Sequence, residues 1–248
     1  MKEILENYQE LIKTKKLIVG VIGLGYVGLP IALEFAKKGY LTYGFDTDES
    51  KIDKLQSGIN YIQDLEDDQI EQVVLDKKLI ARINFEDIQK CNAVFICVPT
   101  PFTPNKDPDI SYIISASNSI RDNLVQNQVI ILKSTTFPGT TEKYVKPILE
   151  QSGKQAGVDF FLAFSPERID PGNKVWTTSN TPVVVGGINE ISTEIASIVH
   201  NVIVTQIKKV NSPAVAEMEK LLENIFRSVN IALVNELAQL CDRIGINI

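Results

Sequence analysis

Cysteine and histidine are both scarce in this chain of 248 residues. The three cysteines, Cys91, Cys97 and Cys241, have neither the spacing of a metal site nor that of a C-x-x-C redox pair. Because their number is odd, reduced thiols in a cytoplasmic protein are the simplest interpretation. We interpret Cys97 and Cys241 as packing residues. The single histidine, His200, follows an apolar segment, and we interpret it as structural rather than as half of a nucleophilic pair.

Long hydrophobic runs and excess positive charge are also missing. No apolar stretch approaches the ~20 residues of a membrane span. The amino-terminal segment carries Glu3, Glu6 and Glu10, so it lacks the apolar core of a secretory signal. A formal net charge of −6 does not favour nucleic acid or an anionic membrane surface as a partner. We therefore expect no nucleic acid and no membrane among the partners of this protein.

Apolar runs alternate with segments of helical periodicity along most of the chain, after a first amphipathic helix. Such alternation predicts the α/β class, with a Rossmann-type, doubly wound and mostly parallel sheet covered on both faces. The predicted strands are 17–22, 41–45, 79–83, 93–98, 129–132, 160–164, 183–185 and 202–204. The predicted helices are 29–38, 50–56, 64–76, 110–124, one ending near 150, and 191–199.

The last segment has a different pattern. Between Pro213 and about Arg243 the sequence has no further proline and no glycine, which predicts one helix of about 45 Å. Such a helix is too long for an ordinary crossover and is typical of a link to a second domain. We expect an amino-terminal helix at 1–16, a Rossmann-like domain at 17–210 and a long central helix at 211–248. The chain ends at Ile248 with little room for another domain, so we expect a fragment.

The segment GLGYVG at 23–28 follows an apolar strand and opens a helix, which is the context that gives G-x-G-x-x-G its meaning. One glycine makes a tight turn, one lets the backbone approach a pyrophosphate, and one permits close helix–strand packing. The pyrophosphate would bind N–H groups at the helix N-terminus. Alternatively, the turn only packs a helix on a strand. The expected cofactor contacts here are Gly23, Gly25, Tyr26, Val27 and Gly28.

Asp46 stands eighteen residues after Gly28, at the end of the next predicted strand. A carboxylate there can accept hydrogen bonds from ribose hydroxyls and would repel a 2′-phosphate, so NAD is favoured over NADP. Asp46 could instead be a helix N-cap, or Asp48 could share or take over its role. Lys51 either lies near the adenosine end or is a solvated helix lysine.

Further polar groups follow other predicted strands, where ligands of doubly wound sheets bind. Thr100 follows one strand and is placed to meet the cofactor, unless it is solvated in a proline loop. Hydroxyls in the run 133–141 could hold the cofactor or a reacting oxygen, or could cap the next helix. Glu167 could act as a general base near the cofactor, or could form a surface pair with Arg168.

Two polar residues share one face of the long helix. Lys220 and Asn224 are four residues apart, so an ammonium and an amide could together stabilise a developing oxyanion. Arg227 lies on much the same face. The alternative is a solvated polar stripe.

Together these segments resemble the UDP-glucose/GDP-mannose dehydrogenase family. The matching pieces are GLGYVGLP at 23–30, CVPTP at 97–101, KSTTFPGTT at 133–141, SPERIDPGN at 165–173 and EMEKLLENIFR at 217–227. The last two look most like the branch that oxidises UDP-N-acetylglucosamine at C6, for bacterial surface polysaccharides. A 2-hydroxyacid or phosphogluconate-type dehydrogenase also places an NAD domain before a long helix, but it lacks the 133–141 and 165–173 segments. A non-catalytic NAD-binding module remains a third interpretation.

The resemblance implies two hydride transfers to NAD, with a cysteine capturing the aldehyde as a thiohemiacetal that is then oxidised to a thioester and hydrolysed. It implies NAD contacts from Val27, Asp46, Lys51, Thr100 and Thr135. Thr135 and Glu167 would handle protons and the attacking water, and Lys220 and Asn224 would hold the oxyanion. Arg168 and Arg227 would contact the UDP-sugar substrate.

The chain departs from the family in one respect. The family's nucleophilic cysteine lies in a glycine-rich loop beyond the long helix, and this sequence ends before that loop. The carboxyl-terminal domain that binds the nucleotide sugar is missing as well. We therefore expect this polypeptide to bind NAD without completing the oxidation. The resemblance also implies a homodimer formed through the long helix.

Overall fold

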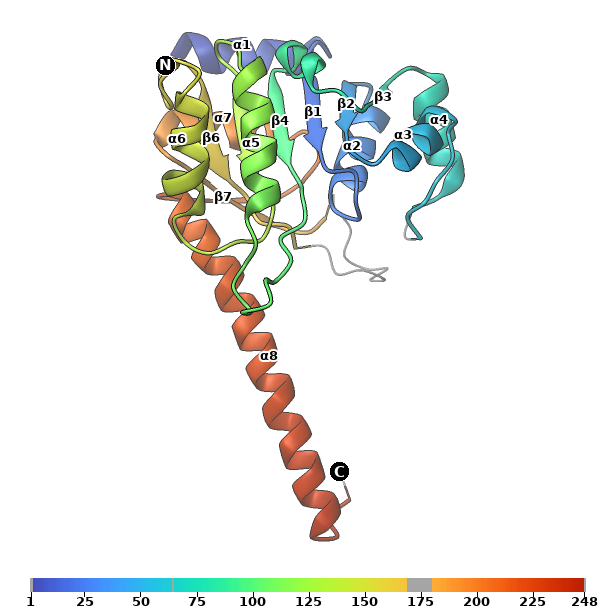
Figure 1. Ribbon diagram of the computed structural model, residues 1–248, viewed down its shortest axis with the longest axis vertical. Helices are drawn as coiled ribbons and strands as arrows, with labels where there is room; N and C mark the ends of the chain where they lie inside the picture. The colour runs from blue at the N-terminus through green and yellow to red at the C-terminus, as the bar shows by residue number, and fades with distance from the viewer. Residues whose placement is uncertain (1, 64, 169–179, 248) are drawn as a thin grey trace.

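A computed structural model describes residues 2–63, 65–168 and 180–247 (Figure 1). One layered α/β unit contains all the strands in this part of the chain, and one long helix projects from it. The strands are β1 (Ile18–Ile22), β2 (Leu41–Phe45), β3 (Leu79–Arg82), β4 (Ala93–Ile96), β5 (Val129–Leu132), β6 (Phe161–Phe164), β7 (Val183–Gly187) and β8 (Ile207–Val210). The helices are α1 (Lys2–Lys13), α2 (Gly28–Lys37), α3 (Glu49–Gln56), α4 (Asp67–Leu75), α5 (Ser111–Asn123), α6 (Lys146–Glu150), α7 (Glu190–His200) and α8 (Pro213–Arg243), with a 3-10 turn η1 (Glu86–Lys90) and a π-helical turn η2 (Thr141–Val145).

The sheet has the strand order of a doubly wound fold. Within the described residues its eight strands are arranged β3-β2-β1-β4-β5-β6-β7-β8. Only the pairing between β6 and β7 is antiparallel, so β7 and β8 run opposite to the other six strands. The first six strands have the order 3-2-1-4-5-6, in which the chain reverses direction across the sheet beside β1. Ligands bind outside the carboxyl ends of strands at such a reversal. The predicted fold class, a mostly parallel Rossmann-type sheet followed by a long helix, is confirmed.

Each face of the sheet has its own apolar core. Successive side chains of β5 alternate between them, so Val129 and Ile131 belong to the core that also contains side chains of α2, α4 and α7, whereas Ile130 and Leu132 belong to the core that contains side chains of α5 and α6. Figure 1 shows α5 and α6 in front of the sheet and α7 behind it. Because both faces are covered, the central strands are continuous apolar runs, which is why the sequence pattern could identify them.

Helix α1 lies across the amino-terminal ends of the strands, opposite the ends where ligands bind (Figure 1). Its only fully buried side chain is Tyr8, whose hydroxyl lies 2.8 Å from the carbonyl oxygens of Asn92 and Asn127. These two residues lie just before the first residues of β4 and β5. The amphipathic helix expected at the amino terminus is therefore present, and it seals the far edge of the sheet.

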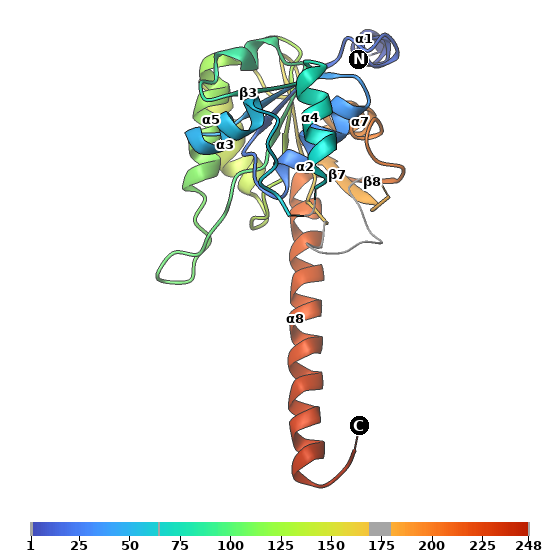
Figure 2. The same ribbon diagram turned by 90° about the vertical axis from the view of Figure 1, so that its right-hand side faces the viewer.

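Helix α8 begins on the sheet and extends away from it (Figures 1 and 2). The Ser212 side chain accepts a hydrogen bond from the Val215 amide, and Pro213 occupies the first helical turn, a combination typical of a helix start. Ala216 and Glu217 are buried against the sheet domain, whereas most side chains beyond Arg227 are exposed. Among the described residues, no helix has the length and apolarity needed to cross a membrane.

The strand predicted at 202–204 is wrong. Val202, Ile203 and Val204 are buried, but they form the turn that follows α7, and the last strand is β8 at Ile207–Val210. Strand β8 lies at the sheet edge and presents Lys208 and Lys209 to solvent. An apolar triplet indicates burial rather than extended backbone, and a charged edge strand carries little apolar signal.

Candidate functional site

A cleft of about 670 Å³ lies at the carboxyl ends of β1, β2, β4, β5 and β6. Each of these strands is followed by a segment that contributes to the walls, so the parallel sheet gathers groups that are far apart in the sequence. The volume lies within the range of small-molecule and cofactor sites. Of the site residues predicted from the sequence, Gly23, Gly25, Tyr26, Val27, Asp46, Lys51, Thr100, Thr135 and Glu167 line this cleft.

The three glycines of the turn meet three different constraints. Gly23 has a φ of +89°, and a Cβ there would lie 2.7 Å from the Cys97 carbonyl oxygen. A Cβ on Gly28 would collide with the Gly23 carbonyl and approach the Cys97 side chain, so Gly28 permits α2 to pack on the strands. A Cβ on Gly25 would meet nothing within 4 Å, although Gly25 lines the cleft. Space for a ligand beside the backbone therefore exists at Gly25.

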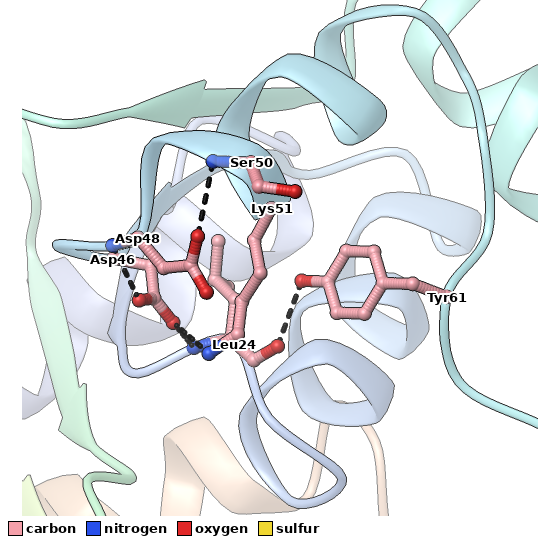
Figure 3. A network of polar contacts seen from close by, with 6 residues as sticks. All are labelled: Leu24, Asp46, Asp48, Ser50, Lys51 and Tyr61. Carbon is pink, nitrogen blue, oxygen red and sulfur yellow. Dashed lines mark hydrogen bonds and ion pairs between the residues drawn. The ribbon is translucent and has the colours of Figure 1, made fainter.

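Asp46 is almost buried at the end of β2 and is bonded on both carboxylate oxygens (Figure 3). Its Oδ2 accepts the Leu24 amide at 2.8 Å and lies 3.0 Å from the Lys51 ammonium, while Oδ1 accepts the Asp48 amide at 3.0 Å. Asp46 is thus hydrogen-bonded to the glycine turn itself. Asp48 instead caps α3, because its side chain accepts the Ser50 amide at 3.0 Å.

The loops after β4 and β5 are joined by hydroxyl groups. The Thr100 hydroxyl donates to the Thr135 carbonyl at 2.7 Å, and the Ser134 hydroxyl donates to the Val98 carbonyl at 2.7 Å. The carboxylate of Glu217 on α8 accepts hydrogen bonds from the Gly139 and Thr141 amides further along the second loop. The sequence did not indicate this role for Glu217. The loops therefore form one wall, fixed to each other and to the base of α8.

A buried ion pair lies at the floor of the cleft. The Lys133 ammonium is 3.3 Å from the Glu167 carboxylate, and only 3% and 10% of the two side chains are exposed. Glu167 also accepts the Arg168 amide at 2.8 Å. The sequence groups Lys133 with the 133–141 segment and indicates no separate role for it. A lysine directly after an apolar strand is the one signal that could have identified it.

Arg168 joins the end of β6 to α8. Its guanidinium bonds Glu219 at 2.9 Å and also pairs with Glu223, and it donates to the Pro182 carbonyl at 3.3 Å. The sequence offered only the neighbouring Glu167 as a partner for Arg168, because the two glutamates lie more than fifty residues away. Residues 169–173 of the SPERIDPGN segment lie outside the described residues.

Lys220 lies on α8 close to these charges. Burial lowers its pKa, and Arg227 and Arg168 lower it further, while Glu167 and Glu219 oppose this shift. Asn224 and Arg227 are exposed on the same helix. Among the described residues that line the cleft, none is Arg168 or one of these three residues of α8. The four residues therefore form a second polar group beside the cleft.

Neither Cys97 nor His200 has the properties of a reactive group. Burial raises the pKa of the Cys97 thiol to about 12, which keeps it protonated. Burial also lowers the pKa of His200 to about 3, and its Nδ1 lies 2.8 Å from the Ala196 carbonyl. Within the described residues, no three His, Cys, Asp or Glu side chains are grouped as a metal site.

Two family models match this chain. The model of the NAD binding domain of the UDP-glucose/GDP-mannose dehydrogenase family matches residues 17–228, and the model of that family's central domain matches residues 214–248. Together they extend over the glycine turn, the whole sheet and α8.

Individual relatives agree with these models. UDP-N-acetyl-D-glucosamine 6-dehydrogenase of Pseudomonas aeruginosa is 40% identical over 235 residues, which cover 94% of this chain and 55% of the relative. UDP-N-acetyl-D-mannosamine dehydrogenase of Pyrococcus horikoshii is 36% identical over 231 residues, covering 93% and 55%. A solved structure of UDP-D-ManNAc dehydrogenase from Pyrococcus horikoshii superposes with a TM-score of 0.88 at 38% identity, over 93% of this chain and 55% of that one. The chain therefore spans about half the length of the relatives it matches.

Proposed function

This chain belongs to the UDP-glucose/GDP-mannose dehydrogenase family, and we propose that it is the NAD-binding half of an enzyme that oxidises C6 of a UDP-N-acetyl-hexosamine to the uronic acid. The observation that carries the proposal is the convergence of the glycine turn, Asp46 and Glu167 on one cleft. We propose UDP-N-acetylglucosamine as the substrate, following the relative from Pseudomonas aeruginosa. Because other relatives are named as mannosamine enzymes, the experiment must distinguish which hexosamine epimer is oxidised.

NAD is the cofactor of this domain family, and the residues of the cleft fit it. The open side of Gly25 and the N-terminus of α2 suit a pyrophosphate, since free backbone N–H groups and the helix dipole both favour an anion. We propose that Asp46 binds the adenosine ribose and that Lys51, Thr100 and Thr135 complete the cofactor contacts. When bound, NAD accepts the hydride that leaves the sugar.

We propose that the remaining polar groups act on the sugar. Glu167 lies at the cleft floor, where a carboxylate can take a proton or orient a water, and Thr135 lines the same wall. Lys220 and Asn224 supply an ammonium and an amide for a developing oxyanion, and Arg168 and Arg227 contact the nucleotide sugar. Arg168 does so while bound to Glu219 and Glu223 of α8.

The nucleophilic cysteine is proposed to belong to another part of the protein. Cys97 is buried under the glycine turn with a raised pKa, and Cys241 lies on the distant part of α8. We therefore propose that the chain alone binds NAD without completing the oxidation. The proposed organisation is a helix at 1–16, an NAD-binding domain at 17–210 and a dimerisation helix at 211–248, with the nucleotide-sugar domain outside this chain.

Calorimetric titration of this chain with NAD and with NADP tests the cofactor half of the proposal. We expect micromolar-to-millimolar NAD binding and much weaker NADP binding. A well-folded chain, judged by circular dichroism, that binds neither cofactor would contradict it. The substrate half is tested on a polypeptide of the relatives' full length, by following NADH formation with UDP-linked N-acetyl-glucosamine, -galactosamine and -mannosamine. Preference for a non-nucleotide hydroxy acid would overturn it.

A further inference from the structure

The peptide groups on the two sides of Leu24 are held by two side chains from different parts of the chain (Figure 3). The Leu24 amide donates to Asp46 at 2.8 Å, and the Leu24 carbonyl accepts the Tyr61 hydroxyl at 2.7 Å. Asp46 belongs to the predicted fingerprint. Tyr61 does not, because it lies in the segment between α3 and α4, thirty-seven residues after Leu24. The middle of the glycine turn is therefore fixed from both sides.

The Tyr61 hydrogen bond determines where the next amide points. The Leu24 carbonyl and the Gly25 N–H belong to one planar peptide, and the described residues contain no cis peptide bond. In a trans peptide these two groups point in opposite directions. Holding the carbonyl toward Tyr61 therefore directs the Gly25 N–H to the opposite side. Among the described residues this N–H has no acceptor, and Gly25 lines the cleft.

The segment around Tyr61 is held by hydrogen bonds and by apolar packing. The preceding side chain, Asn60, donates to the carbonyls of Ile62 at 2.9 Å and Leu65 at 2.7 Å and accepts the Ile62 amide at 2.8 Å. Tyr61, Ile62 and Leu65 also pack against the apolar core. The hydroxyl is therefore placed before any ligand arrives, which is the condition for a group that preorganises a binding site.

The Tyr61 hydroxyl also keeps its proton. Burial raises the pKa of Tyr61, and the nearby carboxylates of Asp46 and Asp48 raise it further. The hydroxyl is therefore a hydrogen-bond donor throughout the neutral range, and the carbonyl of Leu24 can only accept. The direction of this hydrogen bond is fixed by the chemistry of the two groups.

We propose that Tyr61 is a positioning residue for pyrophosphate binding: it orients the Leu24–Gly25 peptide so that the Gly25 N–H faces the phosphates of the cofactor. The inference deepens the proposed cofactor site and rests on it. It assigns a function to the segment between α3 and α4, which no part of the G-x-G-x-x-G pattern predicts.

The test compares Tyr61→Phe with Tyr40→Phe in this chain. Tyr40 also donates to a backbone carbonyl, that of Ile12 at 3.1 Å. It directly precedes β2, however, so it lies at the amino-terminal ends of the strands, away from the cleft. The ligands are NAD, ADP and adenosine, of which adenosine alone lacks phosphate. We expect Tyr61→Phe to weaken NAD and ADP about fivefold, the typical worth of one hydrogen bond, and to leave adenosine unchanged. Tyr40→Phe should leave all three unchanged.

A second readout does not depend on ligand. In the two-dimensional amide NMR spectrum of the ligand-free chain, the Gly25 resonance should shift in Tyr61→Phe and stay in place in Tyr40→Phe. Equal weakening of all three ligands would show general destabilisation and overturn the proposal. So would unchanged NAD affinity with an unmoved Gly25 resonance. A folded wild-type chain that binds no NAD would overturn the proposed cofactor site and this inference together.

Discussion

The ammonium of Lys133 faces the carboxylate of Glu167 at 3.3 Å, and both side chains are almost completely buried at the ends of the neighbouring strands β5 and β6. Burying two charges costs desolvation energy, which their attraction and further hydrogen bonds must offset. Such a pair contributes little net stability, but removing one partner leaves the other charge buried without its counter-ion. Because Lys133 lies on the cleft floor beside Glu167, it is suited to hold the Glu167 carboxylate in one orientation.

Lys133→Met should therefore destabilise the chain strongly. We expect a loss of about 3 kcal/mol, measured as the free energy of urea unfolding, because a buried carboxylate loses its ammonium partner. Lys209→Met is the matched control, since Lys209 pairs with Glu194 at 2.7 Å on the surface. That substitution should cost less than about 1 kcal/mol. Equal losses in the two variants would show that the buried position of the first pair has no energetic consequence.

Asp46→Asn should alter cofactor preference. The asparagine oxygen can still accept the Leu24 amide, but the negative charge beside Lys51 disappears, so a 2′-phosphate is no longer repelled. We expect the ratio of NADP to NAD affinity to rise about tenfold, a change of ~1.4 kcal/mol, in calorimetric titrations. Asp48→Asn is the control, because asparagine caps a helix as well as aspartate does. A larger change in the control would assign the ribose to Asp48.

The strands and their carboxyl-end groups could be predicted because each is a local pattern. Apolar runs such as Val129–Leu132 are buried on both faces, and the parallel arrangement then requires Thr100, Thr135 and Glu167 to meet at one edge. The glycine turn could be predicted for the same reason, since its spacing reflects a local backbone requirement. These features need no knowledge of which distant side chains contact one another.

The features that escaped prediction are contacts between distant segments. The hydrogen bond from Tyr61 to Leu24 and the pairing of Arg168 with α8 join residues that no periodicity connects. The pairing of Lys133 with Glu167 depends on how β5 and β6 align, which the sequence of either strand does not specify. The apolar residues 202–204 show a different case, because they are buried but form a turn rather than the predicted strand.

His200 should make the stability of the chain depend on pH. Its pKa is lowered to about 3 by burial, and its Nε2 has no hydrogen-bond partner among the described residues. The unfolded chain binds a proton near pH 6.5, whereas the folded chain does not, so stability is complete above that pH and falls as the pH drops toward 3. The slope from this residue is about 1.4 kcal/mol per pH unit. Urea unfolding of His200→Gln between pH 7 and 4 should show a slope smaller by about that amount. Parallel profiles for the two proteins would contradict this assignment.

Helix α8 should bring two copies of the chain together. Beyond the sheet it presents an exposed apolar stripe at helical spacing, consisting of Leu222, Phe226, Val229, Leu233, Leu237 and Leu240. Exposed apolar patches of this extent are typical of interaction surfaces, and two such helices could bury the stripes against each other. We expect a dimer in sedimentation equilibrium, with the dissociation constant raised roughly a thousandfold by Phe226→Glu, since the dimer loses two buried Phe side chains that contribute ~2 kcal/mol each.

Ser228→Glu adds the same charge to an exposed position about 200° around the helix from Phe226, so it controls for charge alone. It should leave the dissociation constant nearly unchanged. If the wild-type chain is a monomer at every concentration, the stripe requires a different partner. If instead both substitutions weaken the dimer equally, the interface is not the Phe226 stripe, because a contact through that stripe distinguishes the two sides of α8.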